Sequence, residues 1–403
     1  MAVVKTSHIP NDLALSILSK LSIKSLNRFT CVQKSWSLLF QNPDFMNMFR
    51  TNFISNHDED EDNMTCLLLK ERTRTIAFGN HNTMYTLSSD KFEDMVRLDW
   101  PSPFQENDSH IEILGSASVN GILCLHQEGT DNDSTTIFWN PATGEFKIIP
   151  HSLQPYDDIE FNHRPEAFGY DRVRDDYKLI RYAQYPEDFE GNWVYVPEKN
   201  STFWEFCDIY GDESLWEGRV VEMYDPFWEI YSLKSNSWKK LDVVDMPVPW
   251  PGRSLVNLNE LSHWLGFERN MLTFDFSNEK FYATNLPLES DTIYNYWIEF
   301  DLMVLNGSAA FICSYDETKY FHIWILGELG VQESWTKLFI VGPLTYIRRP
   351  IGSGKRSYLF FTTKDNDLVQ FDLSTQRFEE IEIYVPQVIT YKEILLPIEG
   401  MNN

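Results

Sequence analysis

The first fifty residues follow a helical pattern of hydrophobic positions. The positions at the spacing of one helix face are Leu13, Ile17, Leu18 and Leu21. Pro10 suits the first turn of this helix, because the backbone N–H that proline lacks would have no partner there. Ser25 is a suitable N-cap for a second helix. The apolar stripe of that helix consists of Leu26, Phe29, Val32, Trp36 and Leu39. The pattern predicts a small helical unit over residues 1–50.

This helical unit has apolar residues on more than one face. Leu15, Ile23 and Phe40 lie outside the two stripes. A unit of about forty residues rarely buries enough surface to be stable alone, and its sequence has no disulfide framework or metal-binding motif. We therefore expect it to complete its core against another protein. The alternative is an ordinary helical hairpin that packs on its own domain.

A different pattern begins after an acidic stretch. We interpret residues 51–64 as a solvated linker, because the run from Asp58 to Asp62 is entirely acidic. From Thr65 onward, short apolar or alternating runs are separated by Gly, Asn, Asp and Pro, and long helical patterns are absent. This pattern of short runs and turn residues predicts an all-β domain of many short strands over residues 65–397. The segment VITYKEILLPI near its end is a candidate for the strand that closes the fold, since open sheet edges are a liability.

One hairpin motif recurs along this domain. Five segments place an aromatic residue seven positions before another, and the leading residues are Tyr85, Trp139, Tyr231, Phe274 and Phe371. A looser copy runs from Trp324 to Trp335, with a turn that is longer by four residues. Most intervals between the leading aromatics fit a propeller blade of roughly 40–50 residues. We predict an α+β multidomain chain with a β-propeller of about six blades. Seven blades are the alternative, and a jelly roll or β-sandwich is the competing fold.

Charge and cysteine content narrow the functional classes. The 403-residue chain carries a formal net charge of −26, which argues against nucleic acid and anionic membrane surfaces as partners. Its five cysteines are scattered and form no C-x-x-C pair, as is typical of a reducing compartment. We find no signal-peptide pattern and no apolar run of membrane-spanning length. These observations predict a soluble protein in the cytoplasm, the nucleus or both.

Patterns for catalysis or metal binding are weak. The histidines show neither H-x-x-x-H nor zinc-finger spacing, and His263 and His322 lie in strand-like runs, which predicts packed imidazoles. The segment GSGKRS fails the phosphate-loop pattern, because Arg349 replaces its first glycine and Arg356 replaces its Ser or Thr. We therefore predict no catalytic residue, no metal and no cofactor. A propeller enzyme of the copper-oxidase type is one alternative, and it would require clustered His and Tyr ligands.

The 92-residue interval between Trp139 and Tyr231 could hold a further blade or one long insertion. The segment FGYDRVRDDYKLIRY, which looks like the first strand pair of the blade that YSLKSNSW closes, favours the insertion. The stretch 181–222 holds ten acidic residues, three basic residues and ten aromatics. Aromatic residues with a charged rim are typical of interfaces between proteins. The candidate target-binding residues are Trp193, Tyr195, Phe203, Trp204, Phe206, Tyr210 and Trp216. They predict a loop that binds a target protein carrying basic residues. The alternative is that these aromatics pack the loop onto the propeller rim.

Two sets of motifs resemble a known family. The run from Ile9 to Trp36 resembles an F-box, the helical segment that binds the SKP-like adaptor of a cullin-based ubiquitin ligase. Ser16, Ser22 and Gln33 depart from the usual residues of that motif. The segments that resemble the kelch-like F-box-associated interaction domain of plants are NGILCL, WNPATGEFKIIP, FGYDRVRDDYKLI, YSLKSNSWKKL, LSHWLGF, LTFDFSNEKF and ESWTKLF. The whole chain thus resembles a plant F-box protein of that class.

This resemblance implies the substrate-recognition subunit of an SCF-type (SKP-cullin-F-box) E3 ubiquitin ligase. The F-box would bind the adaptor and through it a cullin, while the propeller would bind a target protein for ubiquitination. The implied adaptor-binding residues are Ile9, Pro10, Leu13, Ile17, Leu18, Leu21, Ile23, Leu26, Val32 and Trp36. The alternative is a protein-interaction scaffold outside any ligase, whose F-box is degenerate at Ser16 and Ser22.

Overall fold

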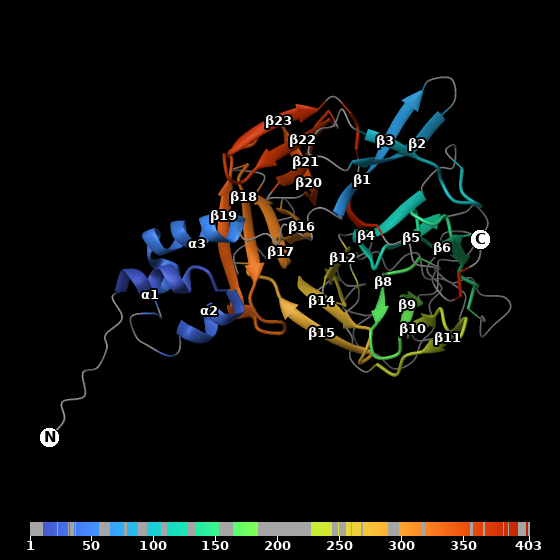
Figure 1. Ribbon diagram of the computed structural model, residues 1–403, viewed down its shortest axis with the longest axis horizontal. Helices are drawn as coiled ribbons and strands as arrows, with labels where there is room; N and C mark the ends of the chain where they lie inside the picture. The colour runs from blue at the N-terminus through green and yellow to red at the C-terminus, as the bar shows by residue number, and fades with distance from the viewer. Residues whose placement is uncertain are drawn as a thin grey trace, which may run out of the picture.

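The computed structural model contains an N-terminal helical module followed by a large β-domain (Figure 1). It describes most of residues 11–55 and, from residue 65, the strands with most of their turns. The longer segments outside the described residues are 1–10, 56–64, 88–94, 106–110, 128–133, 153–163, 184–226, 244–248, 250–254, 289–297 and 394–399. The acidic run of the predicted linker and nearly all of the insertion belong to these segments.

Three α-helices and one 3₁₀ turn make up the described part of the helical module. They are α1 (Asn11–Leu18), α2 (Ile23–Thr30), η1 (Leu39–Gln41) and α3 (Pro43–Ser55). The predicted second helix is too long, because α2 ends at Thr30 and the N–H of Val32 donates to the carbonyl of Phe29 in a tight turn. Ser25 was also wrongly predicted as an N-cap, since α2 already includes it.

Sequence reasoning missed α3, although its start carries a clear signal. The side-chain oxygen of Asn42 accepts hydrogen bonds from the backbone N–H groups of Asp44 and Phe45, at 3.0 and 3.2 Å. Pro43 occupies the first helical position, where its missing N–H costs nothing. Asn-Pro-Asp is therefore an N-terminal capping signature, and it could have been recognised.

The β-domain consists of short strands that follow one another closely along the chain. Those of the first half are β1 (Thr65–Thr75), β2 (Gly79–Leu87), β3 (Met95–Leu98), β4 (Ile111–Val119), β5 (Ile122–Gln127), β6 (Thr135–Trp139), β7 (Phe146–Ile148), β8 (Ala167–Asp171), β9 (Asp176–Ala183), β10 (Phe227–Ser232) and β11 (Ser237–Lys240). The second half contains β12 (Leu255–Leu258), β13 (Leu261–Leu265), β14 (Asn270–Asp275), β15 (Lys280–Asn285), β16 (Ile298–Leu305), β17 (Ser308–Tyr315), β18 (Phe321–Leu326), β19 (Trp335–Val341), β20 (Ile347–Ser353), β21 (Tyr358–Thr363), β22 (Leu368–Asp372), β23 (Arg377–Ile381) and β24 (Gln387–Lys392). A second 3₁₀ turn, η5 (Gln332–Ser334), precedes β19.

These strands form antiparallel sheets arranged around a common centre, as in a β-propeller (Figure 1). Four sheets contain four consecutive strands each, namely β8–β11, β12–β15, β16–β19 and β20–β23. The remaining sheet has eight strands in the order β3-β2-β1-β24-β4-β5-β6-β7, and a single parallel pair, Thr390 with Ala117, joins its two halves. The propeller class is therefore confirmed, and the jelly roll and the sandwich are excluded.

The C-terminal strand joins the two ends of the β-domain. β24 pairs antiparallel with β1, from Thr65–Lys392 to Lys70–Gln387, and so satisfies a sheet edge that would otherwise be open. The side-chain amide of Gln387 also donates to the carbonyls of Ile113 and Gly115 on β4, at 2.7 and 3.1 Å. The sequence-based choice of this segment as the closing strand is confirmed.

Four of the five predicted aromatic hairpins have the expected register. The pairs that face each other across their strands are Trp139–Phe146, Tyr231–Trp238, Phe274–Phe281 and Phe371–Phe378. The fifth differs, because Tyr85 pairs with Arg97 on β3 and its predicted partner Phe92 lies outside the described residues. Ring centroids only 4.4 Å apart in the Phe371–Phe378 pair show that the motif marks packing of the core.

Candidate functional site

The helical module packs directly on the sheet β16–β19. Leu26 and Phe45 are completely buried, and they belong to the same hydrophobic cluster as Ile323 and Ile325 of β18. Figure 1 shows α2 beside this sheet. The expectation that the unit needs another protein to complete its core is therefore wrong. The propeller itself covers one side of the module, since a helical stripe is stabilised by any apolar surface of matching shape.

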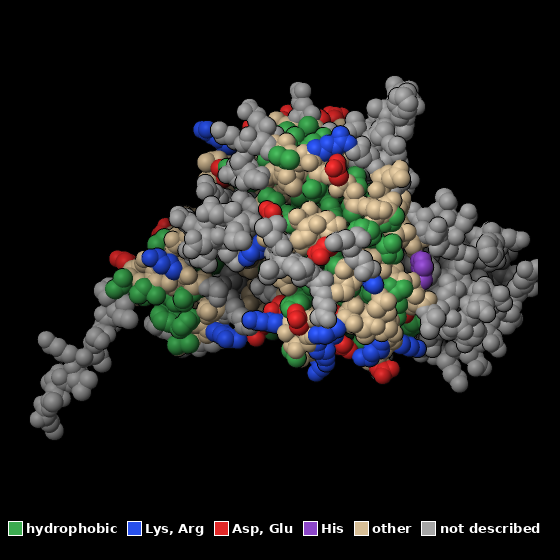
Figure 2. Space-filling model, turned by 45° about the vertical axis from the view of Figure 1, so that its right-hand side comes forward, with side chains coloured by type: hydrophobic (Ala, Val, Ile, Leu, Met, Phe, Trp, Pro, Cys, Tyr) green, Lys and Arg blue, Asp and Glu red, His purple; other side chains and the backbone are tan. Residues whose placement is uncertain are grey.

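The propeller leaves part of the apolar surface of the module uncovered. Five large hydrophobic side chains of the module are exposed, and they are Leu13 (53%), Ile17 (51%), Phe29 (36%), Val32 (68%) and Leu38 (56%). We call these five residues the apolar face of the helical module. Leu13 and Ile17 are one helical turn apart on α1, so they lie side by side. Figure 2 shows hydrophobic side chains gathered on the module at the left of the view.

Docking on the propeller divides the predicted adaptor-binding residues into groups. Leu13, Ile17 and Val32 are exposed, whereas Leu18 and Leu26 are 4% and 0% exposed and lie inside the core. Leu21 and Trp36 are partly buried against the same cluster. Ile9, Pro10 and the side chain of Ile23 lie outside the described residues. A direct contact with a partner is thus open to the first group and closed to Leu18 and Leu26.

Two exposed members of the face were not among the predicted contact residues. Phe29 belongs to the stripe of the second helix, but its ring packs edge-on against Trp36, with centroids 5.9 Å apart, and stays accessible. Leu38 precedes η1. The sequence offered only apolar character at these positions, because exposure depends on which side of the module faces β18.

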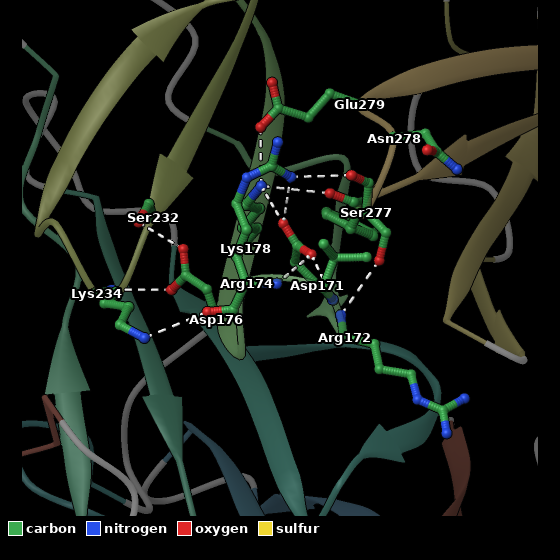
Figure 3. Close-up of polar contacts among 12 residues, drawn as sticks. Asp171, Arg172, Arg174, Asp176, Lys178, Ser232, Lys234, Ser277, Asn278 and Glu279 are labelled. Atoms are coloured by element: carbon green, nitrogen blue, oxygen red, sulfur yellow. Dashed lines mark hydrogen bonds and ion pairs between the residues drawn. The ribbon is translucent and has the colours of Figure 1, made fainter.

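A second group of polar side chains joins the sheets β8–β11 and β12–β15 (Figure 3). The ammonium group of Lys178 on β9 donates to Asp171 at 2.7 Å and to Glu279 at 2.8 Å. The guanidinium group of Arg174 also donates to Asp171, at 2.9 Å, and to the carbonyl of Ser277, at 2.9 Å. We call Asp171, Arg174, Lys178, Ser277 and Glu279 the inter-sheet cluster. Its charges are satisfied within the cluster, which is the pattern of a structural connection between sheets.

The pKa of Asp171 shows how strongly this cluster holds its charges. Burial alone would raise that pKa, but hydrogen bonds from Lys178 and Arg174 outweigh the burial and lower it to about 2. Hydrogen bonds from Lys178 and Lys239 likewise outweigh burial at Glu279 and lower its pKa. Both carboxylates are therefore charged at every physiological pH.

This low pKa predicts a pH dependence of stability with a defined sign. Because the pKa of Asp171 is lower in the folded chain than in an unfolded one, its contribution is complete above about pH 4 and disappears as the pH falls toward 2. A shift of this size corresponds to roughly 2–3 kcal/mol. We expect Asp171→Asn to be less stable than the wild type at pH 5, and the difference to shrink below pH 3. Denaturant unfolding at both pH values measures this, and a difference that is unchanged between them would contradict it.

Chemistry for catalysis or metal binding is not apparent in the described part of the chain. His263 is buried, contacts the hydroxyl of Thr273 at 2.8 Å, and has a pKa lowered to about 4 by burial, so it is neutral. This agrees with the prediction of a packed imidazole. Within the described ranges, no group of three or more His, Cys, Asp or Glu side chains could hold a metal ion. No described helix is long and apolar enough to cross a membrane.

The predicted target-binding residues lie outside the described residues. The strands that flank their insertion, β9 and β10, are described. Arg181 forms a buried ion pair with Glu229 on the neighbouring strand. Its guanidinium group also donates to the hydroxyl of Ser152 at 2.5 Å and stacks over the ring of Trp238, 4.5 Å from the centroid. The seven aromatic residues of the loop, from Trp193 to Trp216, lie outside the described residues, and their role in target binding stays a prediction.

The chain thus combines a β-propeller with an N-terminal helical module whose apolar face is exposed. Two family models, both described as the F-box-associated β-propeller domain, match residues 74–218 and 215–395. The chain belongs to the plant F-box proteins that carry this propeller domain. The resemblance seen in its sequence is thereby confirmed. Both model descriptions name a propeller, and neither names an enzyme.

Relatives from Arabidopsis thaliana match nearly the whole chain. The F-box protein CPR1 is 25% identical over 402 residues, which cover 93% of this chain and 84% of the relative. The F-box/LRR-repeat/kelch-repeat protein At2g27520 is 25% identical over 389 residues, which cover 94% of this chain and 88% of the relative. Both similarities therefore cover more than nine-tenths of this chain.

Proposed function

We propose that this chain is the substrate-recognition subunit of an SCF-type E3 ubiquitin ligase. Residues 1–50 act as the F-box and bind an SKP-like adaptor, and through it a cullin. The predicted linker of residues 51–64 begins too early, because α3 continues to Ser55. Residues 56–64 then link the module to the propeller of residues 65–397, which binds a target protein. The observation that supports the proposal best is the apolar face of the helical module, which stays exposed although Leu18, Leu26 and Phe45 of the same module are buried in a cluster shared with the propeller.

The propeller in this proposal has six blades. Each of the four-stranded sheets is one blade, and the eight-stranded sheet is counted as two blades of four strands. The halves of that sheet share a single parallel pair, which is the contact expected between the innermost strands of neighbouring blades. The 92-residue interval between aromatic motifs then belongs to the long connection between β9 and β10.

The proposed role requires no bond chemistry from this chain. Binding the adaptor on one side and a target on the other places lysines of the target near a ubiquitin-charged enzyme elsewhere on the scaffold. This raises the effective concentration of those lysines, which is how a non-catalytic subunit accelerates a transfer. The packing of the helical module against the propeller favours this role, because a rigid connection keeps the target at one distance and angle.

We assign target binding to the insertion between β9 and β10. Its aromatic residues supply contact area, and its acidic residues suit a target surface that carries basic side chains. Both ends of the insertion leave and re-enter the same sheet, through β9 and β10. A location in the cytoplasm, the nucleus or both is part of the same proposal.

The proposal is tested by reconstituted ubiquitin transfer with purified adaptor, cullin and captured targets. We expect the full chain to drive transfer onto a bound target. A variant that lacks residues 184–219 should keep its adaptor affinity and lose target binding and transfer. Adaptor binding without any transfer onto bound proteins would instead support a non-ligase scaffold. Loss of adaptor binding in the deletion variant would show that the insertion is needed for folding, and would contradict its assignment as the target-binding loop.

A further inference from the structure

The turn between β18 and β19 is longer than its counterparts in other sheets. Residues 327–334 connect these two strands, whereas residues 233–236, 276–279 and 373–376 form the equivalent turns between β10 and β11, β14 and β15, and β22 and β23. The long turn belongs to the sheet on which the helical module packs. We call residues 327–334 the β18–β19 loop. The extra residues are not needed to reverse the chain, since four residues suffice elsewhere.

Hydrogen bonds within the β18–β19 loop hold it in one conformation. The hydroxyl of the buried Ser334 lies 2.9 and 2.7 Å from the carbonyl oxygens of Glu328 and Val331, and it accepts from the N–H of Glu328 at 2.8 Å. Gly330 adopts a φ of +79°, a left-handed conformation that suits glycine. The loop is therefore ordered by its own residues before any partner arrives.

Contacts with the neighbouring sheet fix the position of the loop. The N–H of Gly330 donates to the hydroxyl of Thr284 on β15 at 2.8 Å. The indole N–H of Trp335, just after the loop, donates to the carbonyl of Asn285 at 3.0 Å. A surface loop that is tied both internally and to an adjacent sheet loses little entropy when it binds, which favours its use as a contact surface.

The loop lies beside α2 of the helical module. The guanidinium group of Arg28 on α2 is 3.8 Å from the carboxylate of Glu328, and these side chains are 65% and 41% exposed. Arg28 precedes Phe29 of the apolar face, and Glu328 is three residues before Val331. Val331 is 38% exposed. Val331 is thus an exposed apolar side chain on an ordered propeller loop that contacts α2 through Glu328.

From this arrangement we infer that the adaptor-binding surface continues from the helical module onto the β18–β19 loop of the propeller. The inference rests on the proposed function, because it names a second part of the same adaptor interface. The chemistry that fits is an apolar patch on the adaptor for Val331, with a basic side chain to face the exposed carboxylate of Glu333. If the adaptor contacts both the helices and the propeller, the orientation of the propeller relative to the adaptor is fixed.

The test compares Val331→Asp with Val173→Asp in the full chain, using a purified SKP-like adaptor. Val173 is the control for the same change of residue type, because it is also exposed, at 78% against 38% for Val331, and lies in the turn after β8, on another sheet. We expect Val331→Asp to weaken adaptor binding by about tenfold, and Val173→Asp to leave the dissociation constant within about twofold of the wild type. Because Val331 is exposed, the thermal midpoint should not change in either variant.

A photo-crosslinking residue at position 331 gives an independent readout. We expect it to form a covalent product with the adaptor in the purified complex, and the same residue at position 173 to form none. Wild-type affinity of Val331→Asp, or crosslinking from position 331 only to a target or to a second copy of this chain, would overturn the inference while leaving the proposed function intact. If the wild type itself does not bind the adaptor, the proposed function fails, and the inference fails with it.

Discussion

Replacing Leu13 and Ile17 together by Glu is expected to abolish binding to the SKP-like adaptor. Both side chains are about half exposed on α1, so they are available to a partner and contribute little to the core. Burying each of them against an apolar surface is worth roughly 1–2 kcal/mol, and an unpaired carboxylate in such an interface adds a further cost. The sum of about 3–4 kcal/mol corresponds to a 100- to 1000-fold weaker complex. Isothermal titration with the purified adaptor measures this loss.

The matched control for this variant is the pair Val96→Glu and Ile148→Glu. These residues are 64% and 50% exposed and lie on β3 and β7, away from the helical module. The same number of apolar side chains is thereby changed to carboxylates, with the same effect on net charge. Adaptor affinity should be unchanged in the control, and the far-ultraviolet circular dichroism of both variants should match the wild type. An affinity of the Leu13 and Ile17 variant within threefold of the wild type would refute the adaptor assignment.

From the sequence alone, the pair to substitute would be Leu13 with Leu18. The structure favours Leu13 with Ile17 instead. Leu18 belongs to the same apolar stripe as Leu13, but it is 4% exposed and lies in the core shared with the propeller. Substituting Leu18 by Ala would open a cavity and destabilise the module by about 2–5 kcal/mol. A loss of adaptor binding in that variant would therefore not distinguish a contact residue from a core residue.

The second large effect is expected at the inter-sheet cluster, where Lys178→Ala should destabilise the propeller by roughly 3–5 kcal/mol. The Lys178 side chain is 4% exposed and pairs with Asp171, which is 0% exposed, and with Glu279. Its removal leaves a buried carboxylate without its main counter-charge, and the desolvation of that carboxylate is then uncompensated. The thermal midpoint and the midpoint of urea unfolding should both fall.

Lys239→Ala is the control, because Lys239 contacts the same Glu279 at 2.9 Å but its own side chain is 67% exposed. An exposed ion pair contributes at most about 1 kcal/mol, so this variant should unfold close to the wild type. Equal effects of the two substitutions would show that burial does not govern the strength of the cluster. The cluster joins the sheet β8–β11, which carries the insertion, to the sheet β12–β15. We therefore expect Lys178→Ala to weaken target binding more than adaptor binding.

The fold could be predicted from the sequence because its repeat is local. Pairs such as Phe274 and Phe281 lie on two strands joined by a four-residue turn, so their spacing records the register directly. The closing strand β24 was also predictable, since an apolar run left over at the end of the chain must pair with an open edge. The hairpin that starts at Tyr85 was misassigned, because a spacing of seven does not reveal where a longer connection returns to its partner strand.

The candidate site was predictable only in part. Apolar spacing identifies which side chains of α1 and α2 share a stripe, and it therefore included both Leu13 and Leu26. Whether a stripe residue faces a partner or the core depends on how the module docks, which involves β18, almost three hundred residues away in the chain. The inter-sheet cluster was not recognised for the same reason: Asp171 and Lys178 are close in sequence, but Glu279 comes from another sheet.

By itself, the sequence determined the class of this protein: a helical segment that resembles an F-box, followed by a β-propeller built from one repeated hairpin. These features depend on contacts between residues a few positions apart, and such contacts leave a periodic trace. Only the tertiary structure decided which part of the helical apolar surface is buried, which part stays exposed, and which propeller loop contacts α2. These relations arise between surfaces distant in the chain, where shape and burial, and not spacing, select the contact.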